Sequence, residues 1–168
     1  MKLHADVGAG TVTAFGETVA AAFGKGGAIA AAAKREGDGA TPLGLWPVRA
    51  ALLRPDRVGT PVTRLPWRWL RPQDGWSDGI GDPEYNRPVR WPHRHSAEQL
   101  WREDHVYDII VVLGHNDMPP VVAMGSAIFF HCTRPDRAPT EGCVAVDRNV
   151  LARWLGHMAP GDLMVVGV

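Results

Sequence analysis

Proline and glycine interrupt this chain so often that long helices are strongly disfavoured. The 168 residues include 14 prolines and 19 glycines, and both types occur through most of the sequence. Proline removes a backbone donor and restricts the residue before it, while glycine weakens any regular helix that contains it. The segments that remain between them favour short strands joined by loops. The sequence therefore predicts a mainly β fold.

The length of the chain bounds the number of domains. A chain of 168 residues can bury a sizeable core in one domain and is short for two. No shift in composition and no internal repeat marks a boundary. We expect residues 1–168 to form a single domain.

Six segments are predicted as strands. The run from Tyr107 to Leu113 is rich in β-branched residues, which is typical of an interior strand. The alanine-rich run 28–33 has helical propensity, but the glycines around it favour a strand or loop. Long connections run from about residue 54 to 91, and such loops often line a site. The predicted strands are residues 2–7, 11–15, 50–54, 106–113, 127–132 and 163–166.

Two short helices are predicted between these strands. Ser96 is a typical N-cap, and a helix that follows it would bury Leu100 and Trp101. Asp147 is the predicted N-cap of the second helix, which Gly156 would end. The apolar residues of this second helix share one face. They are Val150, Leu151, Trp154 and Leu155.

The charge balance argues against two classes of partner. Lysine plus arginine and aspartate plus glutamate each number 18, so no net field attracts nucleic acid or an anionic membrane. The basic segment 87–95 has aromatic residues among its cations, as RNA-binding surfaces do, but the neutral chain carries no RNA-binding signature. We expect neither nucleic acid nor membrane as a partner, and a small, near-neutral ligand instead.

The N-terminal segment bears on location. Residues 1–17 lack the unbroken apolar core that follows the basic start of a signal peptide. No apolar run approaches the roughly 20 residues that cross a bilayer as a helix. The sequence therefore predicts a cytoplasmic location.

A histidine and a cysteine stand at a spacing that suits nucleophilic catalysis. His131 ends the apolar run Ile128–Phe130, and Cys143 follows Gly142 twelve residues later. A thiol attacks only when deprotonated, so it needs a nearby imidazole and backbone amides that hold the oxyanion. Alone, His131 is typical of a strand histidine and Cys143 of a small buried side chain. Together they predict a catalytic pair, with the Gly142 and Cys143 amides as oxyanion donors.

The two cysteines also allow uses other than this catalytic pair. Cys132 and Cys143 permit one disulfide, but its formation would disable the nucleophile. A zinc site would need His115, His131 and both cysteines, yet adjacent residues of a strand point to opposite faces. We therefore expect no metal and no cofactor. A redox-sensing thiol protein is a further alternative.

The segment around this pair resembles the catalytic stretch of the L,D-transpeptidase catalytic domain (YkuD-like) family. In that family a strand ends in histidine, and Ser/Thr-x-Gly-Cys follows about a dozen residues later, as His131 and Thr140–Cys143 do here. The segment 34–44 is similar to the family's Gly-x-Thr-Pro-x-Gly turn. Further segments, 85–88, 100–102 and 114–117, are similar to a short branch of cytoplasmic L,D-carboxypeptidases that trim recycled muropeptides.

This resemblance implies a β-sandwich and a cysteine L,D-carboxypeptidase. Cys143 would attack a peptidoglycan stem tetrapeptide and His131 would move the proton, with the Cys132 carbonyl orienting the ring. The terminal D-alanine would leave, and water would resolve the thioacyl enzyme. If an amine resolves it, the protein is an L,D-transpeptidase. A non-catalytic domain that binds wall fragments is the alternative from another class.

Two departures from the family pattern concern substrate recognition. Glu141 stands where the family's Ser-His-Gly-Cys-x-Arg has its second histidine, and Ala145 stands where it has arginine. Glutamate cannot donate a hydrogen bond as a neutral imidazole does, and alanine cannot bind a carboxylate as arginine does. Another arginine must then hold the substrate carboxylate, and Arg87, Arg90 and Arg134 are candidates. The predicted substrate-binding residues are Tyr85, Arg87, His115, Asn116, Arg134, Thr140 and Glu141.

Overall fold

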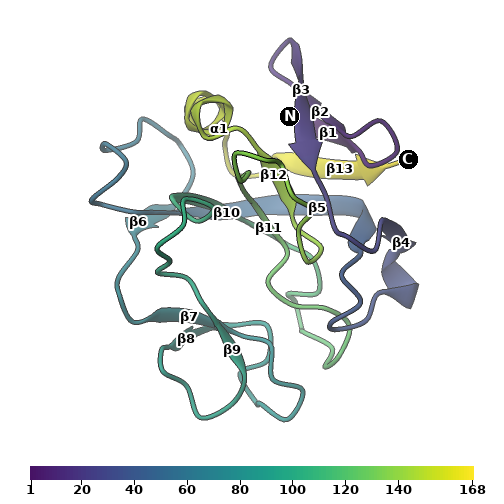
Figure 1. Cartoon of the computed structure of the whole chain (residues 1–168), viewed down its shortest axis with the longest axis vertical. Helices are drawn as coiled ribbons and strands as arrows, with labels where there is room; N and C mark the ends of the chain where they lie inside the picture. Colours follow the sequence, from purple (N-terminus) through teal and green to yellow (C-terminus); the bar gives the residue numbers. More distant parts are fainter.

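The computed structural model describes all residues 1–168, and it is mainly β (Figure 1). One α-helix, α1 (Arg148–Leu155), and one turn of 3-10 helix, η1 (Ala31–Ala33), accompany thirteen strands. The strands are β1 (Lys2–Asp6), β2 (Thr11–Ala14), β3 (Glu17–Ala22), β4 (Ala28–Ala30), β5 (Thr41–Leu53), β6 (Trp67–Trp69), β7 (Asp74–Ser77), β8 (Pro88–Arg90), β9 (Ala97–Gln99), β10 (Ile109–Leu113), β11 (Phe129–Cys132), β12 (Val144–Val146) and β13 (Leu163–Gly167).

The main sheet folds into two layers that pack as a sandwich, and strand pairing connects the two layers along both edges. The strand order is β10-β11-β12-β3-β2-β1-β13-β5-β4, and β10 also pairs with β5. The 13-residue β5 makes this closure possible, because residues 44–47 pair with β13 and residues 48–53 pair with β10. β3 pairs with β2 on one side and β12 on the other. The predicted mainly β sandwich is therefore confirmed.

Alternate residues of β11 face two different cores. Phe130 and Cys132 belong to the larger cluster, which also contains Leu151 and Trp154 of α1. Phe129 belongs to a second cluster on the other face of the strand. Because side chains alternate across a strand, His131 shares the face of Phe129 rather than that of Cys132. This places the histidine away from the main core.

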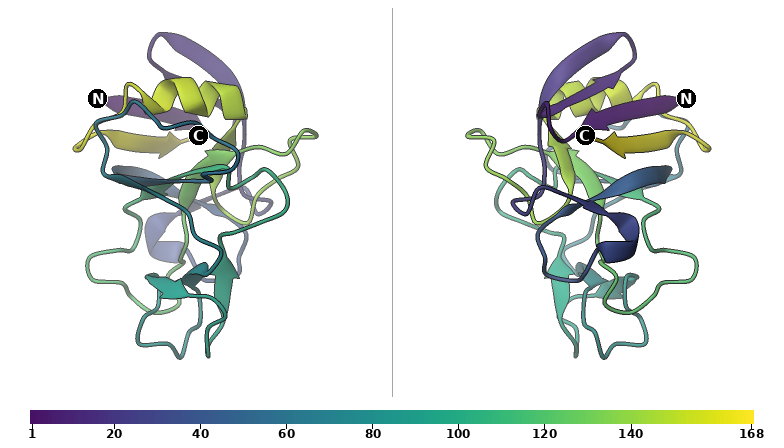
Figure 2. Two further views of the ribbon diagram at one scale, coloured as in Figure 1. Left: turned by 90° about the vertical axis from the view of Figure 1, so that its left-hand side faces the viewer. Right: turned by 90° about the vertical axis from the view of Figure 1, so that its right-hand side faces the viewer.

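A separate three-stranded sheet, in the order β8-β7-β9, lies at the opposite end of the molecule from α1 (Figures 1 and 2). It contains the segment after Ser96, for which a helix was predicted, and that prediction is wrong. Residues 97–99 pair with β7 instead, with Ser77 opposite Ala97 and Gly75 opposite Gln99. Long-range strand pairing has overridden local propensity here.

The remaining predictions of elements are largely confirmed. All six predicted strands are present, although β5 begins nine residues before the predicted segment 50–54. Strand β4 and η1 occupy the run 28–33. The long connections of 54–91 contain β6, β7 and β8, while β3 and β12 were not predicted. No helix in the structure combines the length and apolar character needed to cross a membrane.

Helix α1 begins and ends as predicted. The Asp147 carboxylate accepts a hydrogen bond from the Asn149 amide at 2.8 Å, and Gly156 is the C-cap. Leu151, Trp154 and Leu155 are buried against the sandwich. The cap therefore fixes the first turn of the only α-helix, directly after β12.

Replacing Asp147 by alanine is expected to destabilise the protein by about 1 kcal/mol, because the Asn149 amide in the first turn loses its side-chain acceptor. Asp147→Asn retains a side-chain acceptor and is the control, and its free energy of unfolding should change by about 0.3 kcal/mol at most. Urea unfolding curves of the three proteins measure the difference. Equal stability of wild type and Asp147→Ala would contradict the role of the cap.

Candidate active site

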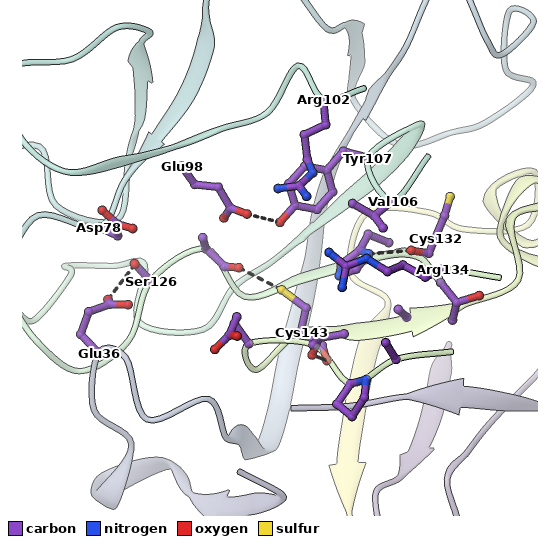
Figure 3. Close-up of a pocket in the computed structure, with 18 residues that line it drawn as sticks. Glu36, Asp78, Glu98, Arg102, Val106, Tyr107, Ser126, Cys132, Arg134 and Cys143 are labelled. Carbon is purple, nitrogen blue, oxygen red and sulfur yellow. Dashed lines mark hydrogen bonds between the residues drawn. The ribbon is translucent and has the colours of Figure 1, made fainter. Parts of the chain in front are cut away.

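A cavity of about 370 Å³ lies between the sandwich and the three-stranded sheet. The sandwich contributes β11, the start of β12 and the connection between them, and the small sheet contributes Asp78 and Glu98. Figure 3 shows the side chains that converge on it. The full lining is Glu36, Asp78, Glu98, Arg102, Val106, Tyr107, Ser126, Ala127, His131, Cys132, Thr133, Arg134, Ala138, Pro139, Thr140, Glu141, Cys143 and Ala145.

The parallel pairing of β11 with β12 brings His131 and Cys143 to this cavity. In its register His131 lies opposite Ala145, and Phe130 lies opposite Val144. One step earlier Cys143 lies beside Phe129, whose amide donates a hydrogen bond to the cysteine sulfur at 3.3 Å. Residues two apart in a strand share a face, so the thiol and the imidazole lie on the same side of the sheet.

Two neighbours hold the ring of His131. Its Nδ1 lies 2.9 Å from the carbonyl oxygen of Cys132, which was the predicted orienting group. A carbonyl only accepts, so Nδ1 carries the hydrogen and Nε2 keeps a free lone pair in the neutral ring. The Tyr107 ring packs edge-on against the imidazole, with centroids 5.2 Å apart. Burial lowers the pKa of His131 to about 4, so the ring is neutral at physiological pH.

Cys143 is held in its protonated form. Burial, followed by the nearby charge of Glu98, raises the pKa of the Cys143 thiol to about 12. The thiol donates to the Ala127 carbonyl at 3.2 Å, and no hydrogen bond joins it to His131. The expected direct contact is therefore not formed in the resting protein, although both groups line one cavity. Catalytic hydrogen bonds commonly tighten only when substrate is bound.

The turn before Cys143 is held by its own side chains. The Thr140 hydroxyl donates to the Cys143 carbonyl at 2.8 Å and accepts from the Gly142 amide at 3.2 Å. Gly142 has φ of 130°, and a Cβ there would lie 2.8 Å from the Ala40 carbonyl oxygen, so only glycine fits. Because the Gly142 amide is already bonded, Cys143 supplies the remaining amide of the predicted oxyanion pair.

Both carboxylates and guanidinium groups line the cavity around the cysteine. In Figure 3 Asp78 and Glu36 lie to one side of Cys143 and Arg134 to the other, while Arg102 lies near Glu98 and Tyr107. Arg102 forms a paired hydrogen bond with Asp104, at 2.6 and 2.8 Å, and the guanidinium of Arg134 lies 3.8 Å from the same carboxylate. The cavity is therefore lined by side chains of both charge types.

The structure brings together about half of the predicted site residues. Cys143, His131, Cys132, Arg134, Thr140 and Glu141 line the cavity. Gly142 lies just behind it, in the turn. Glu141 points to solvent and pairs with Lys25 at 2.8 Å.

Five other predicted candidates lie outside the cavity wall, and three of them have structural roles. Tyr85 is buried and donates to Glu36, which does line the cavity. His115 is buried and bonds to the Met124 carbonyl at 3.1 Å, while the Asn116 side chain binds Val121 and Gly125 within its own loop. Arg87 and Arg90 do not reach the cavity lining.

Sequence reasoning did not identify Asp78, Glu98, Arg102 or Tyr107 as site residues. Glu98 belongs to β9 and Asp78 directly follows β7 of the small sheet, whose existence no local pattern indicated. Arg102 was noted only as part of a similar segment, and Tyr107 only as the start of a strand. The aromatic contact of Tyr107 with His131 depends on the packing of β10 beside β11.

The resting thiol is expected to react slowly with alkylating agents. Its pKa of about 12 makes thiolate scarce at pH 8, so a small neutral haloacetamide should modify Cys143 at least about tenfold more slowly than an unfolded cysteine peptide. The rate should rise with each step of pH above 8, since the thiolate fraction rises until the pKa is reached. Peptide mass spectrometry of the alkylated protein measures it. A rate that is flat between pH 7 and 9 would contradict this assignment.

The L,D-transpeptidase catalytic domain (YkuD) model matches residues 8–166. An L,D-transpeptidase from Mycobacterium smegmatis of known structure is 16% identical, with a TM-score of 0.41, and the match covers 99% of this chain and 58% of that one. No curated protein matches the chain. Because the family model covers far more than half of the sequence, the chain belongs to the L,D-transpeptidase catalytic domain family.

Proposed function

We propose that the protein is a cysteine L,D-carboxypeptidase that removes the terminal D-alanine from peptidoglycan stem tetrapeptides. One observation carries the proposal: Cys143 and a neutral, oriented His131 line the same cavity. Membership of the family supports a peptidoglycan-modifying enzyme of the L,D-transpeptidase type in general. The choice of hydrolysis and of this substrate is our proposal.

Acylation begins with transfer of the thiol proton. When substrate enters, the sulfur of Cys143 leaves the Ala127 carbonyl and gives its proton to Nε2 of His131. The sulfur then bonds to the carbonyl carbon that precedes D-alanine, and the Cys143 amide donates to the oxyanion. The carbon–nitrogen bond breaks, and the imidazolium returns the proton to the departing amine. A pKa of about 4 makes this imidazolium a ready donor.

Deacylation repeats these steps with water. His131 accepts a proton from water as the oxygen bonds to the thioester carbon, and the carbon–sulfur bond then breaks. The sulfur recovers the proton, and the shortened peptide leaves as a carboxylic acid. We favour water over an amine because segments 85–88, 100–102 and 114–117 resemble the carboxypeptidase branch. A cytoplasmic location, where soluble muropeptides are the substrate, belongs to the same proposal.

Arg134 is proposed to hold the terminal carboxylate of the substrate, with Arg102 beside it. Both arginines line the cavity. Arg134 is 48% exposed and its nearest carboxylate is 3.8 Å away, so its donors are available to a ligand. Charge-assisted bonds to a carboxylate are the contacts for which arginine is best suited. In this proposal Arg134 and Arg102 bind the substrate carboxylate in place of the family's arginine, whose position is occupied by Ala145 here.

Release of D-alanine tests the proposed function. Purified protein is incubated with disaccharide tetrapeptide and with free tetrapeptide, and D-alanine is followed by mass spectrometry. Wild type should release it, and Cys143→Ala should lose at least about a thousandfold in rate, because no nucleophile remains. Retained binding by Cys143→Ala, without turnover by wild type, would favour a non-catalytic binder. Addition of D-methionine separates the reactions: exchange faster than hydrolysis would identify a transpeptidase.

Replacement of Arg134 tests the carboxylate contact. Arg134→Ala should raise KM for the tetrapeptide by about tenfold with a smaller effect on kcat, because a charge-assisted bond to the ground state is lost. Arg134→Lys should recover part of the loss. Arg137 belongs to the same loop and lies outside the cavity lining, so Arg137→Ala is the matched control for charge. An unchanged KM for Arg134→Ala would exclude this role.

A further inference from the structure

A second group of reactive side chains lies in the small sheet, outside the active-site cavity. Asp82 and Glu84 belong to the connection between β7 and β8, and His93 belongs to the connection between β8 and β9. One carboxylate oxygen of each acid and one ring nitrogen of the histidine lie within 4.8 Å of one another. None of the three residues lines the cavity that contains Cys143. Two consecutive loops thus bring two carboxylates and an imidazole to one point.

The carboxylate of Asp82 is buried without a permanent positive charge beside it. Only 3% of Asp82 is exposed. Its ion-pair partner is His93, whose Nε2 lies 2.6 Å from Asp82 Oδ2 and which is charged only when protonated. Neither Asp82 nor Glu84 pairs with a lysine or an arginine. Because buried carboxylates in proteins are paired with a cation or coordinate a metal ion, a bound cation would balance this charge.

Hydrogen bonds already hold the Asp82 carboxylate in one orientation. The Ser77 hydroxyl donates to Asp82 Oδ2 at 2.5 Å, and the Glu84 amide donates to Oδ1 at 3.0 Å. The Asp82 amide donates to the Gly79 carbonyl at 2.9 Å, which fixes the backbone of the turn. Outer hydrogen bonds of this kind orient the carboxylate ligands of metal sites. The Asp82 carboxylate is therefore in place before any ion binds.

The other two groups can close on an ion by side-chain rotation. Glu84 is exposed, so its carboxylate is free to turn toward Asp82. His93 Nε2 donates to Asp82 when no ion is bound, because a carboxylate only accepts. With an ion between them, Nε2 offers its lone pair and the neutral ring carries its hydrogen on Nδ1. Zinc binds oxygen and nitrogen ligands at about 2.0–2.2 Å, so the ligand atoms of such a site lie roughly 3.4 Å apart.

The donor set favours zinc over magnesium or calcium. Magnesium and calcium take oxygen ligands, whereas an imidazole nitrogen is typical of zinc and its transition-metal neighbours. The set contains no thiolate or thioether, which argues against Cu(I). Three protein ligands and one water make up the open four-coordinate sites of zinc. The set shares no residue with the zinc site built on the two cysteines, which strand geometry disfavours.

We propose that Asp82, Glu84 and His93 bind one zinc ion that joins the two loops of the small sheet. The strands of this sheet are three or four residues long, and so short a sheet has little core of its own. The ion links the β7–β8 loop to the β8–β9 loop across the intervening strand. Asp78 directly follows β7 and Glu98 lies in β9, so the ion stabilises the part of the fold that carries both side chains to the cavity.

Zinc binding to the untagged Cys143→Ala protein tests the site. This background lacks the thiol beside His131, which could otherwise bind zinc itself. Calorimetry with zinc chloride should show one ion bound per chain, with a dissociation constant of about 10 µM or below. Adding His93→Ala should weaken binding at least about a hundredfold and adding Glu84→Gln at least about tenfold, because each change removes a ligand. His4→Ala removes an exposed histidine of β1 and is the control, with unchanged binding.

Thermal unfolding gives a second measurement of the same site. At a free zinc concentration about one hundred times the dissociation constant, the unfolding midpoint of Cys143→Ala should rise by at least about 3 °C, because the ion binds the folded chain. At the same zinc concentration the rise should be about half as large with Glu84→Gln and nearly absent with His93→Ala. Glu84 is exposed, so its substitution leaves the fold intact and keeps the test decisive if His93→Ala does not fold.

The outcomes decide the zinc site independently of the proposed reaction. Absence of zinc binding to Cys143→Ala overturns the site. Binding that Glu84→Gln and His93→Ala both leave unchanged also overturns it, as does binding of magnesium or calcium as tight as that of zinc. Weakened binding in both variants, with His4→Ala unchanged, supports it. Release of D-alanine is measured separately, so the site and the carboxypeptidase can each fail without the other.

Discussion

The parallel pairing of β11 with β12 is the constraint on which the site depends. Its register sets His131 opposite Ala145 and therefore sets Cys143 beside Phe129, on the same face as the imidazole. A slip of one residue would turn His131 into the larger core and Cys132 toward the cavity. Burial of Phe130 and Cys132 in that core opposes the slip. The packing of apolar side chains on one face thus fixes the chemistry on the other.

Parallel strands need a crossover connection, and here the connection itself becomes part of the site. Residues 133–143 leave the end of β11, turn, and re-enter beside it, and Arg134, Thr140 and Glu141 line the cavity along the way. Near its C-terminal end this loop is anchored by the Thr140 amide, which donates a hydrogen bond to the Phe23 carbonyl at 2.8 Å. Because both ends of this loop continue from buried strands, the loop can hold the Cys143 thiol in place even though most of the loop lies on the surface.

Features encoded by neighbouring residues were predictable, and features made by distant segments were not. The cap at Asp147, the strand 109–113 and the presence of His131 and Cys143 in one cavity all follow from short patterns of residue type. The small sheet does not, because β9 forms only when β7 offers an edge to residues 97–99. For the same reason the sequence could identify Arg134, which lies near Cys143 in the chain, and could not identify Asp78 or Glu98. A polar motif in a loop, as at Arg87 and Asn116, did not indicate a place in the cavity.

The protonation states of the resting site restrict how the thiol can act. With a thiol pKa of about 12 and an imidazole pKa of about 4, both partners are neutral, so a preformed thiolate–imidazolium pair is not available. The proton must then move as substrate binds and the oxyanion forms. Negative charge at Glu98 opposes ionisation of the sulfur, which keeps the thiol protonated until that step.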